Sequence, residues 1–470
     1  MTTSSWDAET EILIAGGGGC GLVAALHARA HGLQVTVLEK EGAFGGTTAM
    51  SGGSIVAADT DAQREAGIDD SPEALAEDII EYTNGHVNSA LVRALAEESS
   101  ELVSWLETDV GVELCINQGP YQRKGHRTYR RHWLVDDEGE IERNGEAVVD
   151  ALLAAARDRG VELLTNHPIT ALITEDGEVV GVEAGKRQTE RIRAQKVILA
   201  TGGFAANVAM REQYCPESTS LLYWGDEGST GDGIRYGQSQ DGATENMTAY
   251  LGFPTIARPE RVFVPWEVSR EGAVIVDQHG RRFADCGSCA YSEFTGYIAD
   301  RSDAESHLIF DQVAYDAMAT QPSTKDRFEN CLDNGAFSSA ETVAGIASTV
   351  EVDAEGLAET LSFLADSEQE MLPDGFGREF RREFEPPFYA TALEPAVFQT
   401  QGGLSINEFG QVLTDDGIPV PNLFAGGGAA TGVSGRTASG YLSGNGLLAA
   451  LNLGRITGRT AAEEAKSEAQ

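Results

Sequence analysis

Residues 11–40 constrain the fold more strongly than any other part of the sequence. A short apolar run leads into Gly16-x-Gly18-x-x-Gly21, a helix-forming stretch follows, and a second apolar run ends at Glu39. Because these glycines have no Cβ, the backbone can approach a pyrophosphate, and the following helix points its N–H groups at the anion. A carboxylate at the end of the second strand accepts hydrogen bonds from ribose hydroxyls. The spacing of these features favours a dinucleotide-binding βαβ unit over a glycine-rich turn in another α/β protein.

Two later segments repeat the combination of an apolar strand with paired glycines. They are residues 196–204, KVILATGGF, and residues 422–433, NLFAGGGAATGV. The loop at residues 44–53, FGGTTAMSGG, comes where a nicotinamide-dependent dehydrogenase would continue into a third βα unit. Its glycines and hydroxyls suit a backbone that lies against a flat ring and a second set of phosphate oxygens. We therefore expect FAD rather than NAD, bound by one α/β sheet assembled from distant segments.

The composition argues against several classes of partner. With 74 acidic and 34 basic side chains the formal charge is −40, and such a surface repels nucleic acid and anionic membranes. No stretch approaches eighteen apolar residues and the first residues are polar, so we expect no membrane span, no signal peptide and a cytoplasmic location. The pair Cys286-x-x-Cys289 has no βαβ context and no second cysteine pair. We therefore expect neither a functional dithiol nor a metal site there.

The sequence resembles the flavoprotein superfamily of fumarate reductases, succinate dehydrogenases and 3-ketosteroid Δ1-dehydrogenases. The matching segments, in family order, are GGGGCG, FGGTTAMSGG, KVILATGGF, GAVIVDQHGRRFAD, LFAGGGAATG and SGNGLLAALNLGRITG. The resemblance implies an α/β fold with a discontinuous, Rossmann-like FAD-binding domain of residues 1–247 and 399–470. An inserted α+β capping domain, residues 248–398, would close over the flavin. Within it, residues 353–364 predict an amphipathic helix, whereas the polar residues 461–470 predict a frayed tail.

The expected FAD contacts lie in the glycine segments and at the start of the last helix. That helix, beginning near Ser443, is expected to point its N-terminus at the pyrimidine edge of the flavin. Because FGGTTAMSGG lacks the histidine that membrane-bound relatives use for a covalent bond, we expect non-covalent FAD. The expected cofactor-binding residues are Gly16, Gly18, Gly21, Glu39, Lys40, Gly46, Thr47, Thr48, Ser51, Gly52, Gly53, Ala200, Thr201, Gly202, Gly426, Gly427, Asn445, Gly446 and Leu447.

The positions that bind substrate in the superfamily argue against fumarate reduction. The resemblance implies an arginine after the GRRFAD strand and two histidines in contact with the substrate of a fumarate reductase. Here the segment after that strand reads CGSCAYSE, and the two histidine positions hold Phe253 and Gln399. We therefore expect Phe253 and Gln399 to contact a different kind of substrate.

The ketosteroid dehydrogenase branch matches better. There a tyrosine removes the α-proton of the ketone, and Ala290-Tyr291-Ser292-Glu293 resembles its motif. A second tyrosine and a glycine N–H hold the ketone oxygen, and Tyr441 and Gly444 stand in the corresponding turn. Tyr121 lies in the region of a third tyrosine that assists the base. For each tyrosine taken alone, the alternative is a packed residue without a catalytic role.

A basic segment stands out in this acidic chain. Five of the 34 Lys and Arg residues fall within residues 123–132. Such a run can be a solvated loop that satisfies nearby acids, or an anion site, because guanidinium groups are suited to carboxylates. Arg127, within this segment, and Arg436, five residues before Tyr441, are the candidate anchors for a substrate carboxylate.

These observations lead to a specific functional hypothesis. The resemblance implies an FAD-dependent α,β-desaturase of a cyclic ketone, and the basic segment favours a small carboxylated substrate of the 4-oxocyclohexanecarboxylate type. The alternatives are a 3-ketosteroid Δ1-dehydrogenase, a fumarate or enoate reductase that runs the reverse chemistry, and a flavin-binding redox sensor. An external electron acceptor or O2 is expected to reoxidise the flavin, and the oligomeric state stays open.

Overall fold

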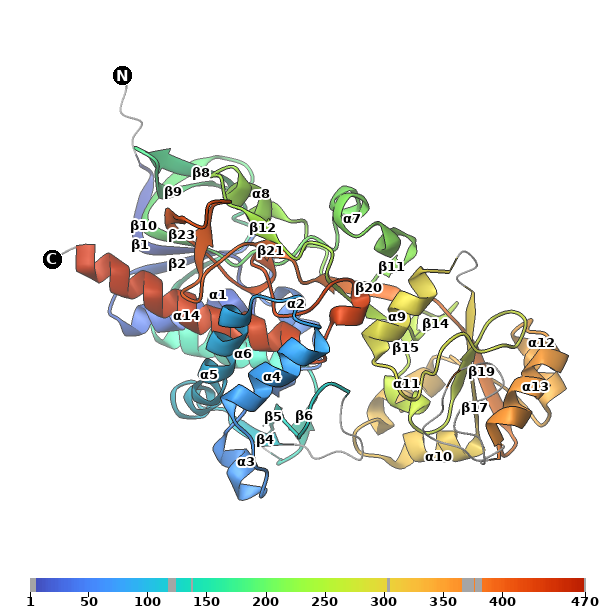
Figure 1. Ribbon diagram of the computed structural model, residues 1–470. Coiled ribbons are helices and arrows are strands. Elements are labelled where there is room, and N and C mark those ends of the chain that lie inside the picture. Colours follow the sequence, from blue (N-terminus) through green and yellow to red (C-terminus); the bar gives the residue numbers. More distant parts are fainter. Residues whose placement is uncertain are drawn as a thin grey trace.

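The computed structural model describes residues 6–116, 124–136, 138–301, 305–365, 376 and 383–468. An eight-stranded sheet forms the centre of the larger part of the molecule (Figure 1). Its parallel strands lie in the order β23 (Pro419–Ala425), β10 (Glu190–Leu199), β1 (Ala8–Ala15), β2 (Val35–Leu38) and β7 (Glu162–Leu164). Antiparallel strands extend it: β22 (Gln411–Leu413) beside β23, and β9 (Glu178–Ala184) and β8 (Ile169–Glu175) beside β10.

This strand order confirms the prediction of one sheet assembled from distant segments. The strands before the three glycine segments, β1, β10 and β23, are direct neighbours. All three run parallel, so their glycine segments meet at the same edge of the sheet. That carboxyl edge is where open α/β sheets bind ligands.

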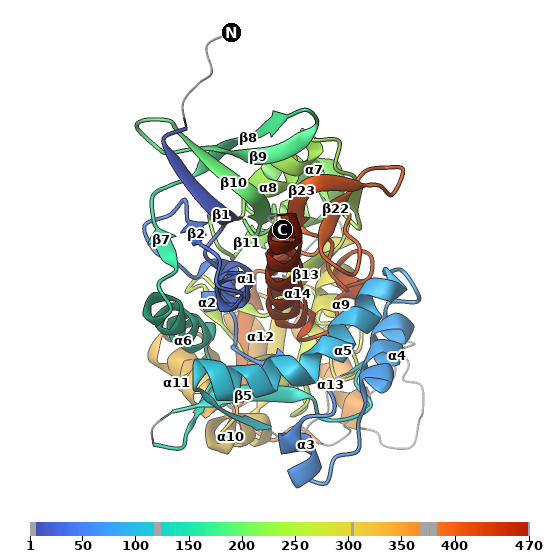
Figure 2. The same ribbon diagram turned by 90° about the vertical axis from the view of Figure 1, so that its left-hand side faces the viewer.

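Helix α14 (Asn445–Glu468) packs against α1 (Gly19–Ala30), and the two lie side by side in Figure 2. Glycines in α14 permit unusually close backbone contact. A Cβ at Gly454 would lie 2.4 Å from the Cys20 carbonyl oxygen, and one at Gly458 would lie 2.3 Å from that of Ala24. The prediction of a frayed tail was wrong: the helix continues to Glu468, because Ala461, Ala462 and Ala465 are buried beside the rest of the core.

A second sheet of six strands forms the smaller part of the molecule, with hydrophobic clusters of its own. It is antiparallel, in the order β15 (Val262–Phe263), β14 (Ile256–Arg258), β19 (Phe388–Leu393), β17 (Ser306–Asp311) and β16 (Val274–Val276), with β18 (Ser338–Ala340) beside β19. The helices of this part are α9 (Tyr291–Ala299), α10 (Gln312–Thr320), α11 (Lys325–Asp333), α12 (Val343–Thr349) and α13 (Ala354–Ala365). The last of these confirms the amphipathic helix expected at 353–364.

The chain passes between the two parts on strands β13 (Tyr250–Phe253) and β20 (Ala396–Thr400). They pair with each other, and β20 also pairs with β11 (Leu222–Tyr223). A four-stranded sheet lies under the larger part and consists of β3 (Ile55–Val56), β5 (Arg131–Val135), β4 (Glu113–Ile116) and β6 (Ile141–Glu142). Its strand β5 carries part of the basic segment.

The remaining elements are short or cover the sheets. They are α2 (Gly46–Ala49), α3 (Asp61–Glu65), α4 (Pro72–Tyr82), α5 (Ser89–Trp105), α6 (Gly145–Asp158), α7 (Val208–Tyr214), α8 (Asp232–Gln238), β12 (Thr244–Glu245), β21 (Gly403–Leu404), a π-helical turn at Leu106–Val110, and 3₁₀ turns at Pro216–Ser220, Trp266–Ser269, Gly427–Ala429 and Ala438–Gly440. Among the helices of the described residues, none has the length and apolar character needed to cross a bilayer.

The close approach of α14 to α1 gives a stability prediction. Gly458→Ala should lower the free energy of unfolding by about 1–3 kcal/mol, because the added methyl group must displace the Ala24 carbonyl. Without that contact, the same change inside a helix would be favourable by about 1 kcal/mol. Urea denaturation of the FAD-loaded protein measures the change. Gly42→Ala is the control, since its added Cβ would lie 4.0 Å from the nearest atom, and equal stability of both variants would contradict the prediction.

Candidate active site

A cavity of about 640 Å³ lies at the carboxyl edge of the main sheet and extends to the second part of the molecule. One end is lined by the glycine segments that follow β1 and β10 and by residues 38–41. The other end is lined by residues of β13, α9, α11 and β20 and of the turn before α14. The two parts of the chain therefore share one site.

The end of the cavity beside β1 has the form of a cradle for an anion. A Cβ at Gly16 would lie 2.2 Å from the Ala200 carbonyl oxygen, so the turn sits tightly on β10. Gly18 differs, because its added Cβ would find no protein atom closer than 3.5 Å and would instead enter the cavity. Gly18 caps α1 without a side-chain hydrogen bond of its own, although Gly19 N donates to Thr48 Oγ1 at 3.1 Å, and a helix N-terminus of this kind suits an anion.

Glu39 fixes the shape of this cradle. Its carboxylate accepts a hydrogen bond from Gly17 N at 2.9 Å and another from Glu41 N at 2.8 Å. It is buried and also lines the cavity. Next to it, the Lys40 ammonium donates to Asp232 at 2.8 Å and to Thr230 at 2.7 Å. The site therefore combines a glycine turn, a helix N-terminus and a buried carboxylate, which together fit the ADP half of a dinucleotide.

Two tyrosine side chains stand on the wall at the other end of the cavity. Tyr291 is the first residue of α9, and Tyr441 lies in the turn before α14, with their ring centroids 6.2 Å apart. The Tyr291 hydroxyl lies 3.0 Å from Ser443 Oγ. Burial raises the pKa of Tyr441 well above its ordinary value, and the neighbouring Tyr291 adds to this. Tyr441 therefore stays protonated at neutral pH and can donate a hydrogen bond.

An aromatic wall adjoins the tyrosines. The Phe253 ring lies 5.2 Å from Tyr291, 4.3 Å from Phe263 and 5.5 Å from Phe398, measured between centroids. All four rings line the cavity, as does Gln399 beside them. This wall offers a flat apolar surface of the size of a small ring.

Three arginines line the same part of the cavity. Arg131 and Arg143 lie 5.9 Å and 5.2 Å from the centroid of the Trp133 ring, on the side of the main sheet. Arg327 comes from α11 on the opposite side and donates to the Arg143 carbonyl oxygen at 3.2 Å. The site thus combines hydroxyl donors, an apolar wall and positive charge, which suits a small anion with a polar carbonyl group.

The comparisons with known proteins agree with this geometry. A family model described as an FAD binding domain matches residues 11–447. The chain belongs to this family. FAD is therefore its cofactor, and the residues of the cradle described above fit the ADP half of FAD.

The relatives act on carbon–carbon bonds. An NADH:fumarate oxidoreductase of Klebsiella pneumoniae is 26% identical over 97% of this chain, and the chain spans about half of that relative, 48% of its length. The open conformation of a flavocytochrome c3 fumarate reductase matches with a TM-score of 0.81 at 27% identity, covering 98% of this chain and 79% of the other. A 3-ketosteroid Δ4-(5α)-dehydrogenase of Rhodococcus jostii RHA1 matches with a TM-score of 0.78 at 25% identity, covering 98% of each chain. The protein is an FAD-dependent oxidoreductase of CH–CH bonds.

Most residues expected to bind the cofactor line the cavity of this FAD-binding protein. They are Gly16, Gly18, Glu39, Lys40, Gly46, Thr47, Thr48, Ser51, Gly52, Ala200, Thr201, Gly202, Gly427, Gly446 and Leu447. The other four are not among the described residues of the lining. A Cβ at Gly21, Gly53 or Gly426 would lie 2.0 Å from Gly16 O, 2.3 Å from Asn144 O or 2.6 Å from Cys20 Sγ, so these glycines serve packing. Asn445 instead donates to Val433 O at 2.8 Å.

Of the residues expected to bind or convert the substrate, some line the cavity and others do not. Tyr291, Tyr441, Gly444, Phe253 and Gln399 line the cavity, whereas Tyr121 lies outside the described residues. Arg436 is exposed and is not among the described residues of the lining. Its segment closes on itself through hydrogen bonds between residues 435, 436 and 440, which directs it to the surface.

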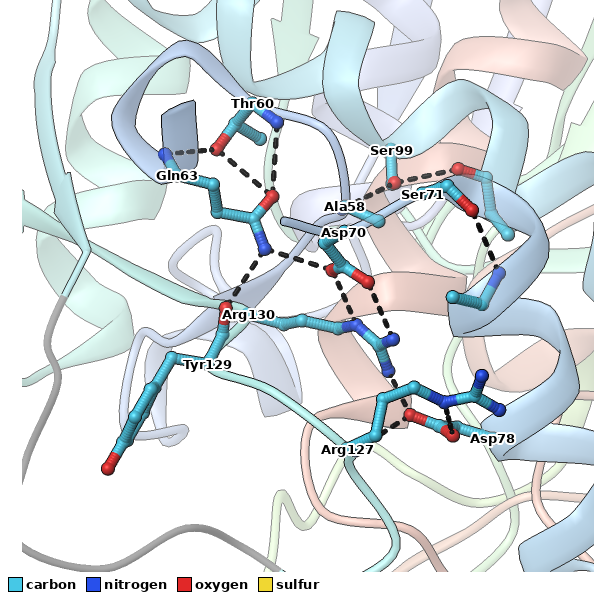
Figure 3. Close-up of polar contacts among 12 residues, drawn as sticks. Ala58, Thr60, Gln63, Asp70, Ser71, Asp78, Ser99, Arg127, Tyr129 and Arg130 are labelled. Atoms are coloured by element: carbon cyan, nitrogen blue, oxygen red, sulfur yellow. Dashed lines mark hydrogen bonds and ion pairs between the residues drawn. The ribbon is translucent and has the colours of Figure 1, made fainter. Parts of the chain in front are cut away.

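The basic segment contains both arginines that are paired with nearby acids and an arginine that lines the cavity, the two possibilities that the sequence left open. Arg127 donates to Asp78 at 2.6 Å (Figure 3) and to Glu77 at 3.2 Å, so it serves structure rather than the cavity. Arg130 is buried and donates to Asp70 at 2.7 Å and to Asp78 at 2.5 Å (Figure 3). Arg131, by contrast, lines the cavity.

Strand alternation within β5 sets the direction of Arg131 and was the missed signal. Arg131 and Trp133 lie on one face of β5 and line the cavity, whereas His132 points to the other face, where its Nε2 lies 2.8 Å from Thr60 Oγ1. Residues 124–130 lie before the strand, so alternation applies only from Arg131 onward and does not account for Arg127. Arg327 carries no comparable signal in the sequence.

Glu39 gives a test of the cradle. Glu39→Gln should weaken FAD binding about tenfold to a hundredfold, corresponding to about 1.5–3 kcal/mol for hydrogen bonds to a charged acceptor. Loss of the bonds to Gly17 and Glu41 would loosen the turn as well. The measurement is titration of the deflavinated protein with FAD. Glu9→Gln, an exposed change on β1, is the control, and acid precipitation of the wild type should release all its FAD. Unchanged affinity in Glu39→Gln would contradict the assignment.

Proposed function

We propose that this enzyme introduces a double bond next to the carbonyl group of a small cyclic ketone that carries a carboxylate. The 4-oxocyclohexanecarboxylate type is the concrete version. The observation that carries the proposal is the meeting of Tyr291 and Tyr441 on one cavity wall, although 150 residues separate them in the chain. FAD, held by the glycine segments and Glu39, supplies the hydride acceptor for such a reaction.

In this proposal Tyr441 holds the ketone oxygen. Removal of an α-proton leaves negative charge on that oxygen, and a donor placed there stabilises the charge as it develops. The raised pKa of Tyr441 keeps its hydroxyl protonated for this purpose. The N–H of Gly446 lies near the same hydroxyl, and Gly444, whose φ is 102°, shapes the turn between them.

Tyr291 is the proposed base. It stands on the same cavity wall as Tyr441, next to the stacked rings of Phe253 and Phe398, which form an apolar surface. A flat substrate ring packed on that surface would present its α-carbon to Tyr291 while the carbonyl group points to Tyr441. Such fixed orientation is a large part of the rate enhancement available to an enzyme.

Arg143 and Arg327 are the proposed anchors of the substrate carboxylate. They approach the cavity from opposite parts of the molecule and are linked by the bond from Arg327 to the Arg143 carbonyl. Arg127 and Arg436 are replaced in this role, since neither is in the described lining.

We also propose that residues 248–398 act as the cap over a FAD-binding domain of residues 1–247 and 399–470, in a cytoplasmic enzyme reoxidised by an external acceptor or O2.

Reduction of a small unsaturated acid is the second candidate. The arginines of the cavity favour it, because the superfamily resemblance assigns the proton-donor role in fumarate reductases to an arginine, and the relatives described above include such enzymes. The deciding experiment mixes the oxidised protein anaerobically with cyclic ketones, with and without carboxylates, and the dithionite-reduced protein with fumarate and cyclic enoates. Bleaching of the flavin by a ketone supports the desaturase, whereas reoxidation by an enoate without any bleaching supports the reductase.

Replacing Tyr291 and replacing Tyr441 should impair different steps of the reaction. Tyr291→Phe should slow flavin reduction by the ketone at least about a hundredfold, as expected for loss of a general base. Tyr441→Phe should slow it by about a hundredfold to a thousandfold, as for loss of one oxyanion donor. Stopped-flow absorbance of the flavin measures both rates. Exchange of the substrate α-hydrogens with deuterium, followed by NMR, should disappear in Tyr291→Phe, and wild-type rates in both variants would refute the assignment.

The carboxylate anchor is tested by comparing two substrates. Arg327→Met should raise the KM for 4-oxocyclohexanecarboxylate at least about tenfold, because one charge-assisted hydrogen bond contributes about 1.5–3 kcal/mol. The KM for plain cyclohexanone should hardly change, because that substrate has no carboxylate. Arg436→Met, at the exposed position, is the matched control and should affect neither substrate. Equal changes for both ketones in Arg327→Met would show that this arginine only supports the structure.

A further inference from the structure

We propose that Ser443 is a positioning residue that holds the hydroxyl oxygen of Tyr291 as a hydrogen-bond acceptor, and that the basic segment acts on the reaction through this serine. The inference rests on the proposed role of Tyr291 as base. It assigns a role to His126 and Arg131, the residues of the basic segment that are bonded to Ser443.

Ser443 is the point where three separate elements meet. Its Oγ accepts a short hydrogen bond from Arg131 Nη2 of β5 and lies 3.0 Å from the hydroxyl of Tyr291 at the start of α9. Its backbone oxygen lies 3.0 Å from His126 Nε2. The serine is buried and lines the cavity, so both its main chain and its side chain are fixed from the basic segment.

The chemistry of these partners sets the direction of the hydrogen bonds. A guanidinium group only donates, so Ser443 Oγ is the acceptor toward Arg131. Its single proton is then available for the oxygen of Tyr291, the other partner within hydrogen-bond distance. A hydroxyl that donates to the tyrosine oxygen favours the form of Tyr291 that can receive a proton.

His126 supports the same arrangement from the backbone. A carbonyl oxygen only accepts, so Nε2 of His126 is the donor toward Ser443. Burial lowers the pKa of His126 to about 4, and the ring is therefore neutral at pH 7 with its proton on Nε2. Two residues of one basic segment thus hold one serine, and the serine reaches the hydroxyl on the cap side of the cavity.

Other ionisable groups also face Tyr291 and must be held constant in a test. They are Tyr441 on the same cavity wall, Tyr82 of α4, Arg131, which is bonded to Ser443, and Glu293 of α9. Glu293 is paired with Lys124 at 2.8 Å. Replacement of Ser443 leaves all of them in the chain. An effect of Ser443→Ala on Tyr291 therefore reports the loss of the serine hydroxyl together with the hydrogen bond that it accepts from Arg131.

The first measurement needs no substrate. The ultraviolet absorbance of tyrosinate is followed against pH, and the spectrum of Tyr291→Phe is subtracted to isolate Tyr291 in the FAD-loaded protein. In Ser443→Ala, corrected with the double variant, the midpoint of this ionisation should move to higher pH, while Ser443→Thr, which keeps a hydroxyl, should retain the wild-type midpoint. An unmoved midpoint in Ser443→Ala would overturn the proposal, and this holds whether or not the enzyme oxidises ketones.

The second measurement uses 4-oxocyclohexanecarboxylate as the probe. Ser443→Ala should keep FAD and its visible spectrum but slow flavin reduction by about tenfold to a hundredfold, the factor for one hydrogen bond to a charged group. In a Tyr291→Phe background, the same change should have no further effect, because its influence passes through Tyr291. A fully additive loss in the double variant would overturn the positioning role. Wild-type rates in Tyr291→Phe alone would instead refute the proposed function.

Discussion

The whole site depends on backbone-to-backbone contact among segments that are far apart in the sequence. The turn at Gly16 rests on the Ala200 carbonyl, the chain at Gly428 would place a Cβ 2.6 Å from Gly203 N, and α14 touches α1 at Gly458. Side chains at these points would separate β1, β10 and α14 by the width of a methyl group or more. The cofactor cradle and the turn with Tyr441 are then fixed relative to each other, because α14 begins only four residues after Tyr441.

This dependence on glycine explains why the fold could be predicted so far from sequence. Glycine segments at strand ends reveal both the strand and its carboxyl edge, so three motifs were enough to predict that β1, β10 and β23 share one sheet, although not their order. At Gly21, Gly53 and Gly426 the motif indicated that a Cβ is excluded but not what excludes it, and their contact with the cofactor stays a prediction. At those three positions the neighbour is protein rather than the space for a ligand.

The substrate end was predicted less completely, for a different physical reason. Tyr291, Tyr441 and Phe253 could be placed by resemblance, since each adjoins a recognisable strand or glycine turn. Arg327 lies on α11, and only tertiary packing between distant segments brings it to the cavity. Arg436 stands near Tyr441 in sequence, yet the hydrogen-bonded loop at 435–440 turns it outward. Proximity to Tyr441 along the chain therefore did not predict which arginine faces the cavity, because tertiary contacts set the direction of these side chains.

The basic segment shows how one stretch of like charges can be divided by secondary structure. In a chain with a formal charge of −40, Arg127 and Arg130 are held by Asp78 and, for Arg130, Asp70. A buried arginine needs such partners, because an unpaired charge in the interior is very costly. At the next position strand β5 begins, and Arg131 lines the cavity. Ion pairs thus hold Arg127 and Arg130, whereas Arg131 donates a hydrogen bond to Ser443 Oγ.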